Sequence, residues 1–494
     1  MPKAMMVFVL ALLLAPVNLV RAQPADPWAL PPEATTSHRL SLPDGSLAYS
    51  AMAGTLDLRN PKGEPEARIF HVAYRVEERD PGTRPITYVF NGGPGAASAF
   101  LHIGGIGPWA FRPTEGPGPV PSGPLAENAA TWLAFTDLVF VDPVGTGWSR
   151  SVEGTEEADR RFWEVGRDLD ALARFVRQHR VQTGRTASPT YLAGESYGGF
   201  RTARLAETLQ TDHGVDLTGI VMISPVLDFA MLEEERHELL PWAVHLPSLA
   251  AVNLEAQGRL SVEALRPVER FALTDYLVGL AAPWGAMDAL VPRIAETVGL
   301  PDDVVARFRG RIPIRAFAKE RGRGNGNGGG VVASLYDGST LTADPYPESP
   351  VARGPDILLQ GAVAPFTTAF VHYAREALGY RTERPYAVLN GEVSGRWDYG
   401  RGGRSATGAL DALREALSAD PALKAMIVHG VTDLVTPYFA SAYVLGQMPM
   451  GERVRLGLYA GGHMMYLRAA PRAELAAEVR DFYRAAGPGT RARD

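Results

Sequence analysis

The residues best suited to do chemistry lie in the run Gly194-Glu195-Ser196-Tyr197-Gly198, which has the pattern Gly-x-Ser-x-Gly. A short apolar run precedes it and a helix-compatible stretch follows it. Between a strand and a helix this pattern forms a sharp turn that exposes the serine hydroxyl above the sheet, and the two glycines give the turn room. The pattern and its context together predict that Ser196 is a nucleophile.

A serine hydroxyl is a weak nucleophile at neutral pH and needs an adjacent base. His463 is the best candidate, because it follows Gly461 and Gly462 at the end of a predicted strand near the C-terminal end. Asp433 also ends a predicted strand and would hold the histidine tautomer and stabilise its charged form. The order Ser196, Asp433, His463 is that of triads built on this kind of turn. These three residues are the predicted catalytic triad.

Acyl transfer also needs two hydrogen-bond donors for the oxyanion of the tetrahedral intermediate. The backbone N–H of Tyr197, directly after the nucleophile, is one predicted donor. The other is predicted at Gly93, in the run Asn91-Gly92-Gly93-Pro94-Gly95 that follows an early apolar segment. Glycine there lets the backbone approach the substrate closely.

The elements that must position these residues are short apolar strands alternating with helical stretches, a pattern typical of parallel βαβ units. Ligand sites then lie at the carboxyl ends of the strands, where the Gly-rich and polar residues fall. Residues 39–79 are predicted to form an antiparallel hairpin at the sheet edge, and residues 23–37 a loose leader. The parallel strands are expected at residues 86–90, 138–141, 190–193, 220–223, 425–428 and 454–459.

From about residue 228 to residue 390 the strand rhythm stops, and this stretch is helical, Pro-punctuated and irregular. The next predicted strand lies at residues 425–428. The predicted class is α/β, with a mostly parallel central sheet flanked by helices and an inserted, mainly helical cap. The expected organisation is a signal peptide (1–22), a first core part (23–228), the cap or lid (229–400), a second core part (401–487) and a disordered tail (488–494).

Four blocks resemble the serine carboxypeptidase family, the relatives of carboxypeptidase Y. They are the loop 91–95, the segment 142–149 (Asp-Pro-Val-Gly-Thr-Gly-Trp-Ser), the elbow 194–199 (Gly-Glu-Ser-Tyr-Gly-Gly) and the Gly-His-Met ending at 462–464. The blocks occur in order and are jointly specific. The resemblance implies an α/β-hydrolase fold and peptide hydrolysis through an acyl-enzyme.

The resemblance also implies a binding site for the C-terminal carboxylate of a substrate. Asn91 and Gly92 would help to bind it, and Glu195 would hold it together with a second glutamate that shares a proton, so that binding favours acidic pH. Ungapped counting places that second glutamate at position 105, where this chain has Gly105. C-terminal specificity therefore does not follow from the resemblance. Arg201 and Arg204, near the elbow, are expected to be exposed helix arginines rather than carboxylate anchors.

The composition of the chain excludes several kinds of partner and of chemical site. The chain has 494 residues, and its 49 basic and 55 acidic residues give a net charge of −6, which argues against nucleic acid as a partner. It has no cysteine, which excludes disulfides, thiolate metal sites and a cysteine nucleophile. No metal-ligand spacing is present, and no cofactor is expected.

Lys3, an apolar run over residues 4–17 and Ala22 resemble a secretory signal peptide, so the protein is expected to be secreted or periplasmic. No later segment is long and apolar enough to span a membrane, and none is expected to hold the mature chain there. The oligomeric state stays open.

The leading hypothesis is an exported serine-type carboxypeptidase-like peptidase acting on a peptide or small acyl substrate. The alternatives are another α/β-hydrolase, namely an aminopeptidase of the prolyl-iminopeptidase kind, an esterase or an acyltransferase. A binding protein that kept the fold without catalysis is a further alternative, which the complete set of candidate catalytic residues disfavours.

Overall fold

The computed structural model describes residues 30–487 except positions 44, 61, 78, 236, 284, 325–329 and 450–452. The predicted signal peptide (1–22) and the predicted tail (488–494) lie outside the described residues.

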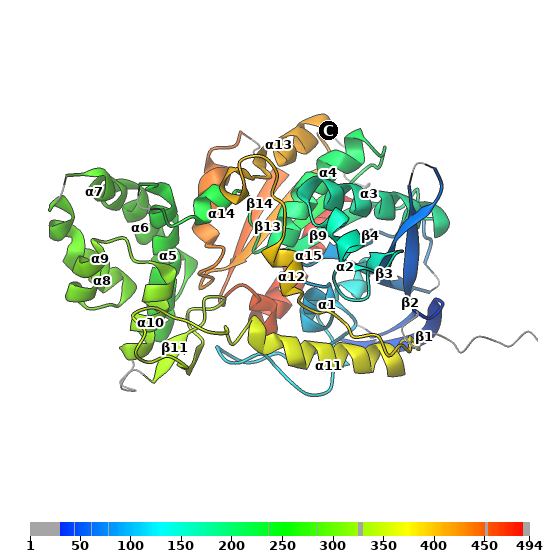
Figure 1. Cartoon of the computed structure of the whole chain (residues 1–494), viewed down its shortest axis with the longest axis horizontal. Helices are drawn as coiled ribbons and strands as arrows, with labels where there is room; N and C mark the ends of the chain where they lie inside the picture. Colours follow the sequence, from blue (N-terminus) through cyan, green and yellow to red (C-terminus); the bar gives the residue numbers. More distant parts are fainter. Residues whose placement is uncertain are drawn as a thin grey trace, which may run out of the picture.

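A ten-stranded sheet runs through the centre of the described chain in the order β1-β2-β3-β7-β4-β9-β10-β13-β14, with β8 paired to β3 (Figure 1). The first four strands of this order pair antiparallel, and those from β7 to β14 pair parallel. With a Gly-x-Ser-x-Gly turn after β9, this is the α/β-hydrolase fold. The strands are β1 (Ala34–Leu42), β2 (Gly45–Arg59), β3 (Pro65–Val76), β4 (Ile86–Phe90), β7 (Asp137–Val141), β8 (Arg150–Ser151), β9 (Thr190–Glu195), β10 (Gly219–Ile223), β13 (Lys424–Gly430) and β14 (Val454–Tyr459).

The parallel strands lie where the apolar runs predicted them, because a strand covered on both faces must be apolar along its whole length. Every residue of β4, β7 and β10 is buried. The N-terminal prediction was wrong in part: β1 begins at Ala34, inside the expected loose leader, and pairs with β2 from Ala34 to Leu42. Its exposed edge position lets polar residues alternate along it, which hides the strand in the sequence.

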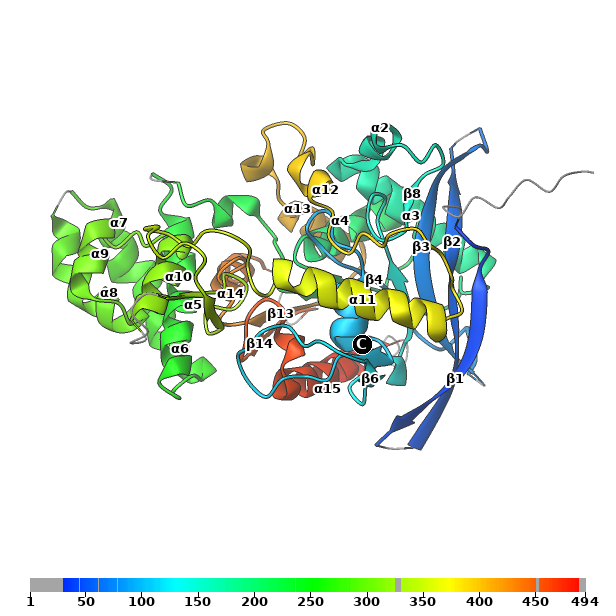
Figure 2. The ribbon, with the colours of Figure 1, turned by 60° about the horizontal axis from the view of Figure 1, so that its bottom comes forward.

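Helices cover both faces of the sheet. One apolar cluster packs α3 (Val165–Gln182), α4 (Tyr197–Thr211) and α13 (Leu410–Ala419) against one face. A second cluster packs α11 (Gln360–Glu376) and α15 (Ala469–Ala486) against the other face, together with the short α1 (Ala99–Leu101) (Figure 2). The sheet is therefore sealed on both sides, and the loops at the carboxyl ends of its strands are left as the place for a site.

The inserted segment forms a helical block beside β14 and α14 (Tyr438–Gly446) (Figure 1). The block has its own apolar cluster, which reaches the main domain through Leu434, Tyr438 and Phe439. Further along the insertion, α11 returns to the core through Phe366 and Phe370. The helices of the block are α5 (Leu240–Ala256), α6 (Val262–Phe271), α7 (Leu277–Ala281), α8 (Val291–Val298), α9 (Asp302–Phe308) and α10 (Ile314–Arg323), followed by the hairpin β11 (Val331–Ala333) and β12 (Leu341–Ala343).

Short elements complete the connections: β5 (Trp109–Ala110), β6 (Ala126–Glu127), α2 (Glu156–Asp159) and α12 (Gly391–Gly395). Within the part of the chain that the structure describes, no helix combines the length and the apolarity needed to cross a membrane.

Candidate active site

Ser196 occupies the turn between β9 and α4 with φ 60° and ψ −123°. A non-glycine residue at positive φ is strained and persists only where its surroundings hold it. The flanking glycines are needed sterically. A Cβ on Gly194 would lie 2.1 Å from the carbonyl oxygen of Gly198, and a Cβ on Gly198 would lie 2.6 Å from that of Phe90. The predicted elbow is therefore present, and Ser196 is its half-buried apex.

Asp433 and His463 meet at the ends of β13 and β14. His463 Nδ1 lies 2.7 Å from Asp433 Oδ2, and both side chains are buried. The carboxylate also accepts hydrogen bonds from the backbone N–H of Val435 and from the backbone N–H and hydroxyl of Thr436, at 2.8, 3.1 and 2.5 Å. These donors aim one carboxylate oxygen at the imidazole.

The charge state of the imidazole follows from its neighbours. Burial disfavours the charged form of His463, but the adjacent Asp433 and then Glu195 outweigh burial and raise the pKa of His463 above its ordinary value. An imidazole with this support can take a proton from a neighbouring hydroxyl. Within the described residues no hydrogen bond joins Ser196 to His463, and such bonds often tighten only when substrate binds.

Ser224, at the end of β10, ties the nucleophile and base segments together. Its hydroxyl donates to the carbonyl of His463 at 2.9 Å, and its carbonyl oxygen lies 3.1 Å from the Thr436 hydroxyl, which makes its shorter bond to Asp433. The backbone N–H of Ser196 donates to Ile223, the residue before Ser224, at 2.9 Å. Ser224 itself has φ 43°. No sequence motif pointed to this residue, because its role depends on three segments distant in sequence.

The loop 91–95 lies directly against the elbow. A Cβ on Gly92 would lie 2.6 Å from the backbone nitrogen of Tyr197 and 2.9 Å from Cβ of Ser196. Gly93 has φ 100°, which favours glycine. The loop that carries Gly93 therefore adjoins Ser196 and Tyr197 through Gly92, and the oxyanion role of Gly93 and Tyr197 stays a prediction.

Asn91 and Glu195 are in direct contact. The Asn91 amide donates to Glu195 Oε2 at 2.6 Å, and both side chains are buried. Burial, more than any other influence, raises the pKa of Glu195 to about 7, although His463 acts in the opposite direction. The carboxyl next to the nucleophile is therefore neutral over much of the acidic range.

Arg201 departs from the prediction, because it is buried rather than exposed. Its guanidinium donates to Asp168 at 2.5 Å and to the carbonyl of Asn91 at 2.6 Å. The reason is that α4 packs under the loop 91–95, whose carbonyl needs a donor. Arg201 thus braces this loop from below, a role that no pattern in the helix sequence indicated.

A cavity of about 390 Å³ adjoins the base. Tyr336 lines it and packs edge-on against His463, with ring centroids 5.1 Å apart. Its wall also includes Val435, Gln360 and Arg315. This cavity has the position expected for a substrate pocket, since one of its walls touches the imidazole.

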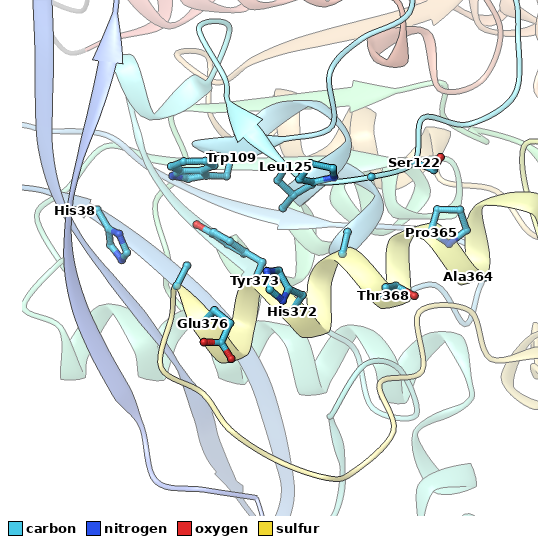
Figure 3. Close-up of a pocket in the computed structure, with 14 residues that line it drawn as sticks. His38, Trp109, Ser122, Leu125, Ala364, Pro365, Thr368, His372, Tyr373 and Glu376 are labelled. Carbon is cyan, nitrogen blue, oxygen red and sulfur yellow. The ribbon is translucent and has the colours of Figure 1, made fainter.

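Another cavity, of about 690 Å³, lies between α11, β1 and the loop 122–125 (Figure 3). None of the predicted site residues lines it. Its polar side chains include His38, His372 and Glu376, from two elements. No group of three or more His, Asp or Glu side chains suited to a metal occurs among the described residues.

Comparison with known proteins shows a similarity over part of the chain. Residues 47–248 match the family model "Serine carboxypeptidase". The chain is 31% identical over 176 residues to "Serine carboxypeptidase-like 45" of Arabidopsis thaliana, a match that covers 34% of this chain and 35% of the relative. It is also 31% identical over 174 residues to "Pheromone-processing carboxypeptidase KEX1" of Yarrowia lipolytica, covering 35% of this chain and 25% of the relative.

Residues 47–248 are therefore similar to the serine carboxypeptidases, the family that the motifs resemble. The matches span about a third or less of the length of these curated relatives. Among solved structures, the proline iminopeptidase of Mycobacterium smegmatis covers 92% of this chain and matches over its own full length, with 15% identity and a TM-score of 0.36. That likeness adds nothing to the fold established by the strand order.

Proposed function

We propose that this chain is an exported serine-type peptidase, similar to the serine carboxypeptidases, that cleaves peptide bonds through an acyl-enzyme on Ser196. The observation that carries the proposal is the buried His463–Asp433 pair, with Nδ1 and Oδ2 2.7 Å apart, in the same loop cluster as a strained serine elbow. The similarity of residues 47–248 to serine carboxypeptidases supports the same reaction class.

In the proposed mechanism Ser196 Oγ attacks the scissile carbonyl while His463 takes its proton. The N–H groups of Gly93 and Tyr197 stabilise the oxyanion. His463 then gives its proton to the leaving amine, water attacks the acyl-enzyme with His463 as base, and Ser196 is regenerated. Asp433 keeps the Nδ1 proton of His463 in place throughout.

The acyl part of the substrate is proposed to occupy the cavity beside Tyr336. Most of the wall, including Tyr336, Gln360 and Arg315, comes from residues 229–400. This supports the proposal that the inserted segment acts as a cap that determines specificity.

A fluorophosphonate probe tests the mechanism, since it reacts selectively with activated serines. We expect the mature protein to be labelled at Ser196, and Ser196→Ala to abolish labelling and to lower peptide hydrolysis by on the order of 10⁶-fold. Retention of more than about a tenth of the hydrolysis in a clean Ser196→Ala preparation would refute the triad. The mass of the exported protein's N-terminal peptide tests cleavage near Ala22.

Ester hydrolysis or acyl transfer by the same residues is the second candidate. It is favoured by Gly105, which stands where the family resemblance implies the second glutamate of the carboxylate site. An N-blocked peptide with a free C-terminus, its amide and a simple ester, assayed side by side, separate the two candidates. Trimming of the free peptide only supports the carboxypeptidase reading, and turnover of the ester alone supports the second.

A further inference from the structure

The space beside Gly105 is filled by the ring of Tyr466. A Cβ on Gly105 would lie 2.8 Å from Cδ2 of Tyr466, and a Cβ on Gly104 would lie 2.9 Å from Cε2 of the same ring. Contacts below 3.0 Å require something to shift, and here a buried aromatic ring would have to move. Position 105 must therefore be a glycine while Tyr466 is in place, because a side chain at 105 would occupy the volume of the Tyr466 ring.

Arg472, on α15, holds this arrangement from behind. Its guanidinium donates to the carbonyls of Tyr466, Gly104 and Phe111 at 2.7, 2.6 and 2.9 Å. Arg472 is only 5% exposed. The buried Arg472 guanidinium therefore joins the segment that carries Tyr466 to the segment that carries the two glycines. These hydrogen bonds fix the position of Tyr466.

The Tyr466 hydroxyl and the Glu195 carboxyl are neighbouring buried groups. Tyr466 Oη and Glu195 Oε1 are both inaccessible to solvent, and neither has a hydrogen-bond partner among the described residues. They lie close enough to interact: Glu195 raises the pKa of Tyr466 further after burial, and the phenol acts to lower that of Glu195. Two buried polar atoms without other partners are expected to satisfy each other.

The remaining polar atoms of this group are also used internally. Glu195 Oε2 accepts from the Asn91 amide at 2.6 Å, and Asn91 Oδ1 accepts from the backbone N–H of Leu101 at 3.0 Å. The exposed fractions of Asn91, Glu195 and Tyr466 are 1%, 4% and 1%. A substrate carboxylate would have to break these contacts to reach any of the three side chains.

We infer that Asn91, Glu195 and Tyr466 form a buried catalytic brace that positions the three catalytic loops, and that they do not bind a substrate carboxylate. Asn91 begins the oxyanion loop, Glu195 directly precedes the nucleophile, and Tyr466 lies three residues after the base. Tyr466 takes the place of the second carboxyl group that the family resemblance implies. This chain is therefore expected to accept acyl substrates both with and without a free C-terminal carboxylate. The inference rests on the proposed function.

The test uses Tyr466→Phe, which removes the hydroxyl and keeps the ring. Tyr459→Phe is the matched control, because Tyr459 also donates its hydroxyl to a glutamate, Glu478, outside the catalytic loops. The first readout is the rate of fluorophosphonate labelling of Ser196, which involves no substrate carboxylate. We expect Tyr466→Phe to slow labelling by about tenfold, since small displacements of catalytic groups cost 10- to 100-fold, while Tyr459→Phe stays within about twofold of wild type.

The second readout is steady-state hydrolysis of an N-blocked dipeptide and of its C-terminal amide. For the brace, wild-type kcat/KM for the two substrates agrees within about threefold, and Tyr466→Phe lowers kcat for both equally with KM unchanged. A strong wild-type preference for the free acid, with Tyr466→Phe raising KM for the acid alone, would show a carboxylate site and overturn the inference. An unchanged labelling rate for Tyr466→Phe would also overturn it.

A second pair of variants guards against a folding defect. The amide of Glu195→Gln can still bond both Asn91 and Tyr466, whereas Glu195→Ala can bond neither. We expect Glu195→Ala to slow labelling at least tenfold more than Glu195→Gln, and equal losses would contradict the brace. Absence of labelling in wild type would instead refute the proposed function, and the brace would fall with it.

Discussion

The substitution Asp433→Asn tests the base most directly. Asp433 offers one oxygen to the N–H groups of Val435 and Thr436, and the other to His463 and the Thr436 hydroxyl. An asparagine keeps the first set of bonds with its carbonyl, so its NH₂ group must face His463 Nδ1. The imidazole then carries its proton on Nε2 and cannot accept the proton of Ser196. The wrong tautomer in a comparable triad lowers kcat by about 10⁴-fold, and we expect a loss of that order here.

The assay is the rate of fluorophosphonate labelling of Ser196 at pH 8, backed by hydrolysis of an activated ester. Asp137→Asn is the matched control, because Asp137 is also buried and is bonded to Arg84 and Arg185. It is the first residue of β7 and so lies at the amino ends of the parallel strands, away from the proposed site at their carboxyl ends. We expect this control to lower the melting temperature and to leave the labelling rate of the folded protein unchanged. A loss below about tenfold for Asp433→Asn would refute the reasoning.

Three further outcomes follow from the site. His463 acts as a base only when it is neutral, and its pKa is raised, so kcat/KM should rise with pH through a value above 6.5. The Glu195 carboxyl, with a pKa of about 7, should broaden this rise as it ionises. A profile that stays flat down to pH 5 would exclude His463 as the base. In Gly92→Ala the new methyl would lie 2.6 Å from the Tyr197 nitrogen, so we expect kcat to fall by 10²- to 10³-fold, the loss typical of a missing oxyanion donor. Ester kinetics measure this loss, and Gly391→Ala is the control because no atom lies within 4 Å of its new methyl. Arg201→Ala leaves Asp168 buried without its partner and should cost about 3–5 kcal/mol in urea unfolding, and a cost below about 1 kcal/mol would show that this ion pair contributes little.

Much of the fold could be predicted because most of its parallel strands are short apolar runs, and several of them end in a motif. The runs at 86–90 and 190–193 became β4 and β9, and their register partners bring Phe90 beside Gly194. The edge strand β1 was missed over Ala34–Ser37, since a strand with one neighbour and a solvated face carries a weak apolar signal. Local pattern thus predicts the interior of a sheet better than its margin.

The site divides in the same way. Ser196, Asp433 and His463 were predicted from their places after strands, because parallel strands bring all their carboxyl ends to one edge. The partners that hold them were not predictable: Ser224, Arg201, Tyr336 and Tyr466 stand in no recognisable motif. Each acts through a backbone group or a buried atom of a segment far away in the chain.

What the sequence determined by itself is the scaffold and the proposed chemistry: the elbow, the order of the proposed triad and the glycine-rich loop 91–95. Only the tertiary structure decided what surrounds them. The sequence shows Gly105 as a missing side chain, and the fold fills that space with a tyrosine more than three hundred positions further on. The physical reason is that steric volume and the pairing of buried polar atoms are properties of neighbours in space, and chain order does not record them.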